Sequence, residues 1–436
     1  MVTILSVHVI VIALGSAGDV HPLIGLSLTL RGRGNDVLMI GPSVFRIVAE
    51  RVGLEYVGIG TQDEYREALR DPDLWHPTRS FSVVARRLIL PALRPVYETI
   101  QNRRRANTVL ISACTAFGAR IAQEKLRVPL ATIHLQPIML RSALRPACFG
   151  FPDVLNHLPR VLRRVYYRVA DAVIVDPLVA NETNHFRAEL GLPPVTRLFN
   201  RWIHSPDLVI GLFPEWFSPP PPDWPPNVAL TGFPLWDESE VRTPSSEIEE
   251  FLKVDDPPLV FTAGSANIQG KKFFEVAADV CRITGRRGLL LTQFPEQLPR
   301  SLPNAVRHFH YVPFSEVLPR SLALVHHGGI GTMSQAIAAG IPQLIIPTSH
   351  DQPDNAVRIR RLGIGDFLRP NECKADCVVA KLAALQDPAV REQCRHRAVD
   401  VGDCKALEMA AMLVERLGAR NSSNSAGQFQ RSTGRS

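Results

Sequence analysis

The stretch His326-His327-Gly328-Gly329-Ile330-Gly331-Thr332 decides the fold class of this chain. It lies between an apolar run at residues 322–326 and a helical pattern at 332–339, so it predicts a strand, a tight turn and a helix. Glycines let the backbone approach a ligand closely, and the free amides at a helix N-terminus attract anions. A histidine at the strand end can add a hydrogen bond or a positive charge to a diphosphate. The same turn could also be purely structural, so its meaning depends on the rest of the chain.

The rest of the chain repeats the strand–helix pattern in two similar halves. In the first half, apolar runs at 4–14, 37–40, 108–112 and 130–134 alternate with helical segments at 22–32, 43–53 and 117–127. In the second half, runs at 259–262, 288–292, 322–326 and 343–346 alternate with helices at 272–284 and 332–339. Nearly continuous apolar runs are typical of parallel strands that are buried on both faces. We predict an α/β protein with two Rossmann-like domains facing each other across a cleft.

A change of composition marks the domain boundary. Prolines crowd residues 214–226, and a polar, acidic stretch follows at 237–256. We predict an N-terminal domain at 1–236, a linker at 237–257 and a C-terminal domain at 258–418. The last helix is a candidate to pack back on the first domain, and the polar tail at 419–436 is predicted to be disordered.

Charge and cysteine content narrow the function classes. The formal charge of +7 and the isoelectric point near 9.2 would suit nucleic acid, but no nucleic-acid motif accompanies the arginines. We therefore expect no nucleic-acid partner; solvated arginines remain compatible with an anionic substrate or with peripheral contact to an acidic membrane surface. Seven scattered cysteines indicate a reducing compartment rather than a disulfide framework. The apolar run at 4–14 is too short to span a membrane and lacks a cationic leader, so we predict a cytoplasmic protein, with the inner face of the membrane as an alternative location.

Two further motifs carry candidate site residues. Asp351 and Gln352 follow the run at 343–346, at the strand end where open α/β sheets bind ligands, and a carboxylate beside an amide suits sugar hydroxyls. Asp19 lies in the turn at 15–22 after the first apolar run, where it could act as a general base at the mouth of the cleft. Either aspartate could instead cap a helix. His21 is a second candidate beside Asp19.

Together these motifs resemble the GT-B nucleotide-sugar glycosyltransferases, a group that includes bacterial natural-product and sterol glycosyltransferases. The resemblance lies in Gly-Asp-x-x-Pro at 18–22, Gly-Ser at 264–265, His-x-Gly-x-Gly-Thr at 327–332 and Asp-Gln at 351–352. Within the group, the sequence is most similar to the rhamnosyltransferases of rhamnolipid biosynthesis. That likeness includes segments outside the sugar-nucleotide motifs, such as Asp-Pro-Asp-Leu-Trp at 71–75 and Thr-Gly-Phe-Pro-Leu at 231–235.

The resemblance implies an inverting hexosyltransferase that needs neither a metal nor another cofactor. The donor would be a UDP- or dTDP-sugar, with dTDP-L-rhamnose as one candidate. Asp19 is implied as the base that activates the acceptor, and His327 as the residue that contacts the diphosphate. A glutamate of plant-type relatives that binds the ribose is replaced here by Gln335. The donor-binding positions implied by the resemblance are Gly264, Ser265, Tyr311, Val312, Gly329, Gly331, Thr332, Gln335, Asp351 and Gln352.

The acceptor is the less determined substrate. Apolar and aromatic residues among arginines at 71–100 and 137–167 suit an amphiphilic lipid or natural product, and they suit an ordinary core equally well. His21, Trp75 and His134 are the predicted acceptor contacts. Asp71-Pro72-Asp73 has the form of a manganese motif of another glycosyltransferase fold, but we expect no metal there. A sugar-nucleotide epimerase of the same fold and a non-catalytic nucleotide-sugar or lipid-binding protein remain as alternatives.

Overall fold

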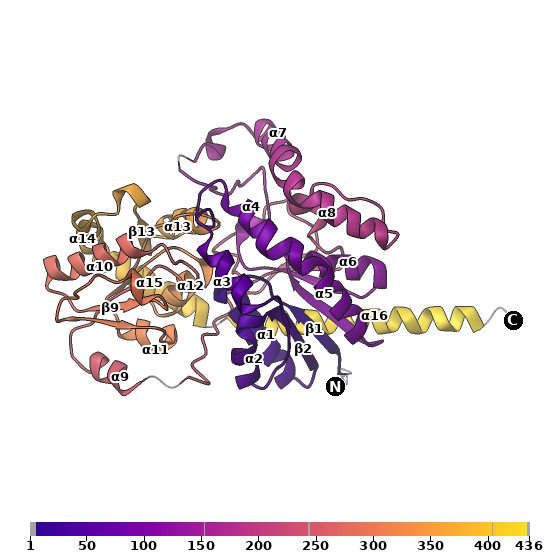
Figure 1. Ribbon diagram of the computed structural model, residues 1–436, viewed down its shortest axis with the longest axis horizontal. Helices are drawn as coiled ribbons and strands as arrows, with labels where there is room; N and C mark the ends of the chain where they lie inside the picture. The colour runs from indigo at the N-terminus through magenta and orange to yellow at the C-terminus, as the bar shows by residue number, and fades with distance from the viewer. Residues whose placement is uncertain (1–5, 152, 243–244, 403, 434–436) are drawn as a thin grey trace.

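The chain forms two parallel β-sheets that belong to separate halves of the sequence (Figure 1). The computed structural model describes residues 6–151, 153–242, 245–402 and 404–433. The N-terminal sheet has the strand order β3-β2-β1-β4-β5-β6-β7, and the C-terminal sheet has the order β10-β9-β8-β11-β12-β13. This is the predicted pair of Rossmann-like domains. The strands are β1 (His8–Ile12), β2 (Asp36–Pro42), β3 (Glu55–Ile59), β4 (Thr108–Ala113), β5 (Leu130–His134), β6 (Leu208–Gly211), β7 (Val228–Leu230), β8 (Leu259–Thr262), β9 (Gly288–Leu291), β10 (Val306–Phe309), β11 (Ala323–His326), β12 (Gln343–Ile345) and β13 (Gly365–Phe367).

Helices cover both faces of each sheet, because the strands are apolar on both sides. Successive side chains of a strand point to opposite faces. Along β1, Val9 and Val11 join one buried cluster, whereas Ile10 and Ile12 join another. The helices are α1 (Ala17–Gly32), α2 (Arg46–Arg51), α3 (Gln62–Arg70), α4 (Ser80–Val84), α5 (Leu90–Arg103), α6 (Phe117–Leu126), α7 (Arg160–Ala170), α8 (Asp176–Glu189), α9 (Ser246–Leu252), α10 (Lys271–Thr284), α11 (Phe314–Val317), α12 (Ile330–Ala338), α13 (Gln352–Arg361), α14 (Ala375–Ala384), α15 (Pro388–Gly402) and α16 (Ala406–Thr433).

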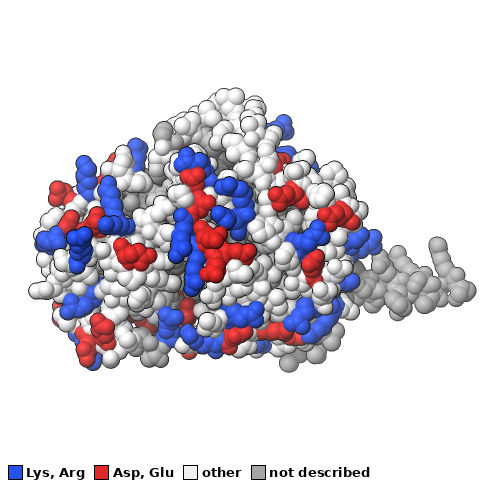
Figure 2. All heavy atoms as spheres, in the orientation of Figure 1, with Lys and Arg blue, Asp and Glu red and all other residues white. Residues whose placement is uncertain are grey.

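The two domains share a continuous apolar contact. One buried cluster includes Leu23 on α1, Met333 on α12 and Ala410 on α16. Figure 2 shows that charged side chains of both signs are spread over the visible face, and that the surface at the top, over α7, is largely uncharged. None of the helices in the described part of the chain combines the length and the apolar character needed to cross a bilayer.

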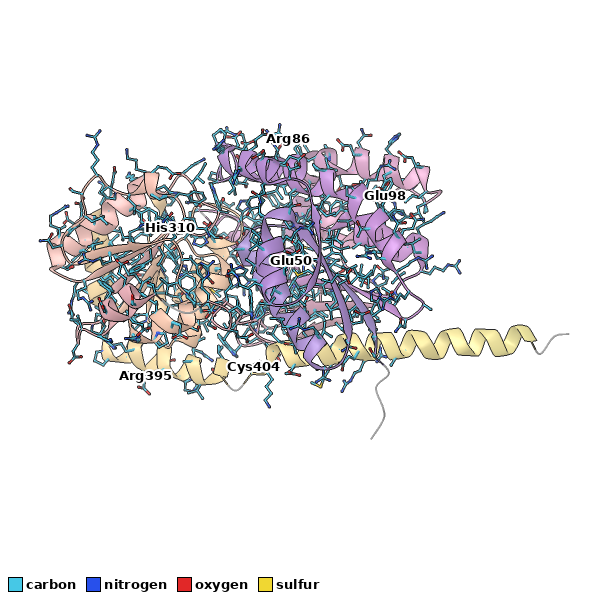
Figure 3. The ribbon with its side chains drawn as sticks, turned by 60° about the horizontal axis from the view of Figure 1, so that its bottom comes forward. Glu50, Arg86, Glu98, His310, Arg395 and Cys404 are labelled. Carbon is cyan, nitrogen blue, oxygen red and sulfur yellow. The ribbon has the colours of Figure 1, made fainter. Side chains whose placement is uncertain are left out.

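The chain crosses back from the C-terminal domain to the N-terminal domain near its end. Figure 3 shows this crossing at the bottom of the molecule, from Arg395 on α15 past Cys404 into α16. The Cys404 thiol lies 3.0 Å from the carbonyl oxygen of Thr231, a residue that follows the last N-terminal strand. The tail from residue 419 continues α16 as helix to Thr433, where the sequence predicted disorder, and residues 434–436 lie outside the described residues.

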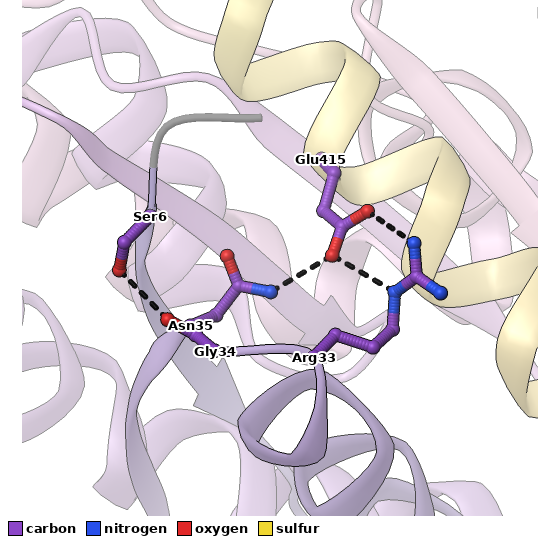
Figure 4. Close-up of a pocket in the computed structure, with 5 residues that line it drawn as sticks. All are labelled: Ser6, Arg33, Gly34, Asn35 and Glu415. Atoms are coloured by element: carbon purple, nitrogen blue, oxygen red, sulfur yellow. Dashed lines mark hydrogen bonds and ion pairs between the residues drawn. The ribbon is translucent and has the colours of Figure 1, made fainter. Parts of the chain in front are cut away.

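A charged contact fixes α16 to the first domain. Glu415 accepts hydrogen bonds from Arg33 at 2.9 and 2.7 Å and from the Asn35 amide at 2.9 Å (Figure 4). Ser6, Gly34 and these three residues line a cavity of about 390 Å³ between α16 and the end of α1. Because Glu415 is almost fully buried, its charge depends on these donors.

Candidate active site

The turn between β11 and α12 holds two histidines with different surroundings. His326 is fully buried at the strand end; its Nε2 lies 2.9 Å from Oε1 of Gln343, and its Nδ1 accepts the Gly328 amide at 3.1 Å. Both ring nitrogens of His326 are therefore occupied by the protein. The Nδ1 of His327 is buried and has no hydrogen-bond partner among the described residues. Of the two side chains, only His327 keeps a ring nitrogen for a ligand.

Two glycines make room for the His327 ring. A Cβ on Gly264 would lie 2.8 Å from Cε1 of His327, and a Cβ on Gly329 would lie 2.5 Å from its Nε2. The backbone of Gly264 has φ +95°, a conformation that side-chain-bearing residues rarely adopt. Burial lowers the pKa of His327 to about 4, so the imidazole is neutral at pH 7 in the free protein. An anion beside the ring would favour the protonated form.

Asp351 lies at the start of α13 and reaches the turn before α12. Its Oδ2 accepts hydrogen bonds from the Ile330 amide at 3.3 Å and from the Asn355 side chain at 2.7 Å. Burial raises the pKa of Asp351 to about 7. Asn355 is fully buried and also donates to the Gly328 carbonyl at 2.9 Å, so it ties α13 to the glycine turn. Asn355 was not predicted from the sequence, although its spacing of four from Asp351 on one helix face was available as a signal.

Gln352 is engaged within its own loop. Its Oε1 accepts the Thr348 amide at 2.8 Å and the Thr348 hydroxyl at 2.9 Å, and the Ser349 amide lies 3.3 Å away. The side-chain nitrogen is then the group of Gln352 that could reach a ligand. The contact fixes the loop that precedes Asp351.

Asp19 lies inside the first turn of α1. The helix begins at Ala17, five residues earlier than the sequence predicted, because the Asp19 carboxylate reaches back to accept hydrogen bonds from Ser16. Oδ2 of Asp19 accepts the Ser16 amide at 2.9 Å and the Ser16 hydroxyl at 3.2 Å. A Cβ at position 15 would lie 2.2 Å from Oδ2 of Asp19, so Gly15 gives the carboxylate its space. Burial raises the pKa of Asp19, which makes the carboxylate a stronger base.

The starts of α1 and α12 face each other across the domain boundary. A Cβ on Gly331 would lie 4.0 Å from Cα of Gly18, and the negative charge of Asp19 contributes to the raised pKa of Asp351. The charge of Asp19 also raises the pKa values of Tyr65 and Cys114, after the larger effect of burial. Tyr65 comes from α3 and no local sequence signal places it near Asp19. The structure thus brings the predicted base and the predicted anion site together.

The remaining donor-site predictions differ in their surroundings. The hydroxyl of Tyr311 donates to the Asp237 carbonyl at 2.6 Å, and the Arg242 guanidinium lies 4.5 Å from the ring centre. One face of the Tyr311 ring is therefore covered by the linker and is not free to stack on the nucleobase of the donor. Val312 is buried in the C-terminal core, and Ser265 is exposed beside Gly264. Thr332 and Gln335 lie in the first two turns of α12, where Thr332 is half-buried and Gln335 buried.

The three predicted acceptor contacts lie apart from one another. Nε2 of His21 pairs with Glu238 of the linker at 3.3 Å, and its ring meets Trp236 at 5.3 Å. His134 is fully buried, with its Nε2 at 3.0 Å from Nδ1 of His204. Neither histidine is on an open surface, because each is already held by a neighbour from a distant part of the chain.

Trp75 crosses to the other domain. Its ring meets His350 edge-on at 5.5 Å, and Nε2 of His350 lies 3.0 Å from the Leu74 carbonyl oxygen. The Gln269 amide adds a contact of 3.4 Å to the Pro72 carbonyl. The segment 71–76 of the N-terminal domain therefore covers the loop that carries Asp351. This position places Trp75 beside the predicted sugar site.

The two carboxylates of the Asp71-Pro72-Asp73 motif contact other groups of the protein. Asp73 pairs with Arg79 at 2.7 Å, and Asp71 accepts the Asp73 amide at 3.0 Å. Within the described ranges, no group of three or more His, Cys, Asp or Glu side chains is arranged to hold a metal.

Comparisons with known proteins agree with this geometry. The N-terminal domain model of glycosyltransferase family 28 matches residues 9–144, and the C-terminal domain model of erythromycin biosynthesis protein CIII-like proteins matches residues 290–415. The O-mycaminosyltylonolide 6-deoxyallosyltransferase of Streptomyces fradiae is 29% identical over 94% of this chain and 97% of its own length. The crystal structure of the kitacinnamycin glycosyltransferase superposes with a TM-score of 0.72 at 18% identity, covering 95% of this chain and 99% of that one. A spinosyn rhamnosyltransferase solved with thymidine diphosphate has a TM-score of 0.65 at 18% identity, covering 94% of this chain and 99% of that one.

The fold, two Rossmann-like domains each built on a parallel sheet, is that of the GT-B glycosyltransferase structures. The two family models match one in each domain. In both sequence and fold, the chain is similar over most of its length to glycosyltransferases.

Proposed function

We propose that the enzyme transfers a hexose or deoxyhexose from a UDP- or dTDP-sugar, with inversion and without a metal, to a hydroxyl of an amphiphilic lipid or natural product. The observation that carries this proposal is the approach of α1 to α12. It brings Asp19, a buried carboxylate with a raised pKa, to the anion site formed by Gly331, Thr332 and His327.

The donor diphosphate would occupy the start of α12. The first amides of a helix have no carbonyl partner in the preceding turn, and the helix dipole favours negative charge there. His327 adds a ring nitrogen that has no other partner in the described structure. These fixed donors would stabilise the charge that develops on the leaving diphosphate. Gln335, one turn further along α12, is the candidate to bind the ribose of the donor nucleotide. The backbone of Val312 is the candidate to hydrogen-bond the nucleobase.

Asp19 would act on the acceptor. As the acceptor oxygen forms its bond to the anomeric carbon, the bond from that carbon to the diphosphate breaks and the hydroxyl proton moves to the Asp19 carboxylate. Attack from the face opposite the leaving group inverts the anomeric carbon. Asp351 and the Gln352 amide would hold the sugar hydroxyls, with Trp75 and its segment covering the sugar from the N-terminal side.

The donor and acceptor identities rest on chemistry and likeness. The deoxysugar transfer named for the Streptomyces relative, and the thymidine diphosphate bound by the spinosyn enzyme, support a dTDP-deoxysugar, with dTDP-L-rhamnose as one candidate. Likeness to the rhamnolipid rhamnosyltransferases supports a hydroxy-fatty-acid acceptor.

A substrate screen tests the proposal. The protein is incubated with UDP-glucose or dTDP-L-rhamnose, with and without a β-hydroxy fatty acid or a macrolide aglycone, in EDTA. We expect nucleotide diphosphate release that requires an acceptor and gives a glycosylated product. Free sugar or an epimer formed without acceptor would indicate an epimerase instead. Nucleotide binding without turnover would indicate a binding protein, and activity restored only by manganese would contradict metal independence.

A further inference from the structure

Helix α7 exposes its apolar side chains, which is unusual for a helix on the surface of a globular domain. Its inward face consists of Arg163, Tyr167 and Ala170, whereas its valines and leucine point outward. Surface helices ordinarily bury their apolar stripe. The outward apolar side chains on α7 and the following π-helical turn η5 (Asp171–Val175) are between 46% and 69% exposed, and they are Val161, Leu162, Val165, Tyr166, Val169, Val173 and Ile174.

These residues form one continuous stripe. Positions 161, 165, 169 and 173 recur at intervals of four, and 162 and 166 lie beside them, so they share one side of the helix. Phe149, which is 41% exposed, lies next to the inward face of α7, with its ring 6.3 Å from that of Tyr167. A contiguous exposed apolar patch on a surface element marks a contact with a partner or a lipid surface.

The inverted orientation of α7 is built into the fold. Arg163 donates to the carbonyls of Ala143 at 3.2 Å and Asn156 at 2.9 Å. Asp171, which is fully buried at the end of α7, pairs with Arg141. Rotating the stripe inward would break both contacts and leave a buried carboxylate without its partner. The apolar side chains therefore remain on the surface.

A row of arginines borders the part of the stripe that lies on α7. Arg160, Arg164 and Arg168 recur at the same interval of four, next to Val161, Val165 and Val169 on the helix surface. All three are exposed, and within the described ranges none of their guanidinium groups has a hydrogen bond or ion pair. Helix α7 contains no acidic residue.

We propose that the α7 stripe docks the enzyme on an anionic lipid surface. An apolar face that enters the headgroup region, with basic side chains along its edge, is the arrangement of helices that lie in a membrane interface. Protein interfaces also contain arginine, but three exposed arginines on a helix without an acidic residue make this surface positive, and anionic headgroups neutralise such a surface. The lipid surface satisfies both features of α7 at once, because acyl chains cover the valines and phosphate groups meet the arginines. The sequence offered residues 137–167 for the acceptor, but the apolar side chains of 161–166 are exposed on the surface, and we assign them to the lipid contact instead.

Vesicle sedimentation with the full-length enzyme tests the proposal. We expect binding to vesicles of phosphatidylcholine with phosphatidylglycerol, and weak binding to phosphatidylcholine alone. The double substitution Val165→Asp, Val169→Asp should abolish binding to both. Arg164→Ala, Arg168→Ala should weaken binding to the anionic vesicles by about 25-fold, at about fivefold for each arginine, and 0.5 M salt should mimic this loss.

A matched control separates the stripe from surface apolarity in general. Ile283→Asp, Val399→Asp places two charges on exposed apolar positions of α10 and α15 and should leave vesicle binding unchanged. All variants should melt like the parent protein, since every substituted side chain is exposed. Failure of the parent enzyme to bind anionic vesicles, or undiminished binding by the aspartate pair on α7, would overturn the proposal. Self-association in sedimentation velocity that the same aspartate pair abolishes would also overturn it, because the stripe would then be an interface between copies.

Discussion

His326 and His327 are adjacent in the sequence, but only one of them has a ring nitrogen to offer a ligand. Both Nε2 and Nδ1 of His326 have protein partners, whereas Nδ1 of His327 has none among the described residues. His327→Ala should weaken binding of UDP or dTDP by about ten- to hundredfold, the loss of one charge-assisted hydrogen bond worth about 1.5–3 kcal/mol. Titration calorimetry with each nucleotide measures this change.

The matched substitution is His326→Ala. It removes a buried ring with two partners, so it should lower the free energy of unfolding by about 2–4 kcal/mol. Denaturant unfolding of both variants gives the comparison. A stable His326→Ala variant with the larger loss of affinity would show that the diphosphate contact belongs to His326.

Asp351 predicts a pH dependence of stability in the free enzyme. Its pKa in the folded state is about 7 because of burial, against an ordinary value of 3.8. The folded state thus holds a proton that the unfolded chain releases, and the stability gained from this proton is lost as the pH rises from about 4 through 7. Asp351→Asn keeps the acceptor oxygen for Asn355 and Ile330 without the charge. It should match the parent near pH 4 and be more stable at pH 8 by up to about 4 kcal/mol, as followed by thermal melts. If the variant and the parent melted at equal temperatures at both pH values, ionisation of the Asp351 carboxyl group in the folded state would cost little free energy.

At the level of elements, the contact between α16 and α1 predicts how the C-terminal helix is held. Arg33 and Asn35 stabilise the charged form of Glu415, and the hydrogen bond from Arg33 holds its pKa below the ordinary value of 4.5. A lowered pKa contributes stability above that ordinary value, and this contribution disappears as the pH falls through the pKa of the folded state. Glu415→Gln should therefore cost about 1–3 kcal/mol at pH 7 and much less near pH 2, where the carboxyl group is protonated in the folded state as well. Urea unfolding at the two pH values measures the difference.

Glu408 supplies the control for Glu415. It pairs with the same Arg33 at 3.0 Å, but its side chain is about half exposed, at 47%. Glu408→Gln should change the stability by less than about 1 kcal/mol, as is usual for surface ion pairs. An equal loss for both variants would show that burial of Glu415 does not matter.

The regular elements were largely predictable, and the exceptions have physical causes. The predicted strands at 130–134 and 259–262 coincide with β5 and β8, because each is a short apolar run between clear breaks. Helix α1 begins before Pro22, the residue at which the sequence predicted its start. The contact of the Asp19 carboxylate with Ser16 begins the helix earlier, and the helix continues through the proline. Helix α7 shows an apolar stripe in the sequence, but the sequence does not say that the stripe faces outward.

At the scale of the whole molecule, the two-domain architecture followed from the repeated pattern, but the contacts between domains did not. Trp75 meets His350, and His21 meets Glu238, through pairings of residues more than two hundred positions apart. Neither partner carries a local signal for the other. The anion turn and Asp351 were predictable because their residue types lie at strand ends, where parallel sheets gather their ligands. The side chains that surround Asp19, such as Tyr65, could be identified only from the tertiary structure.

The central claim is that the approach of the two domains makes Asp19 the base of the transfer reaction. Asp19→Asn keeps an oxygen that can accept the Ser16 amide and hydroxyl, so the first turn of α1 should remain capped. An amide cannot accept the acceptor proton, and such assistance typically contributes about 10²–10⁴ in rate.

The decisive measurement is therefore the turnover number of Asp19→Asn for sugar transfer, taken beside its nucleotide affinity and its melting temperature. We predict a fall in kcat of about 10²–10⁴, with the nucleotide dissociation constant near that of the parent and a melting temperature that is equal or higher. A variant that binds nucleotide, melts like the parent and still transfers sugar within about threefold of the parental rate would show that Asp19 only caps α1.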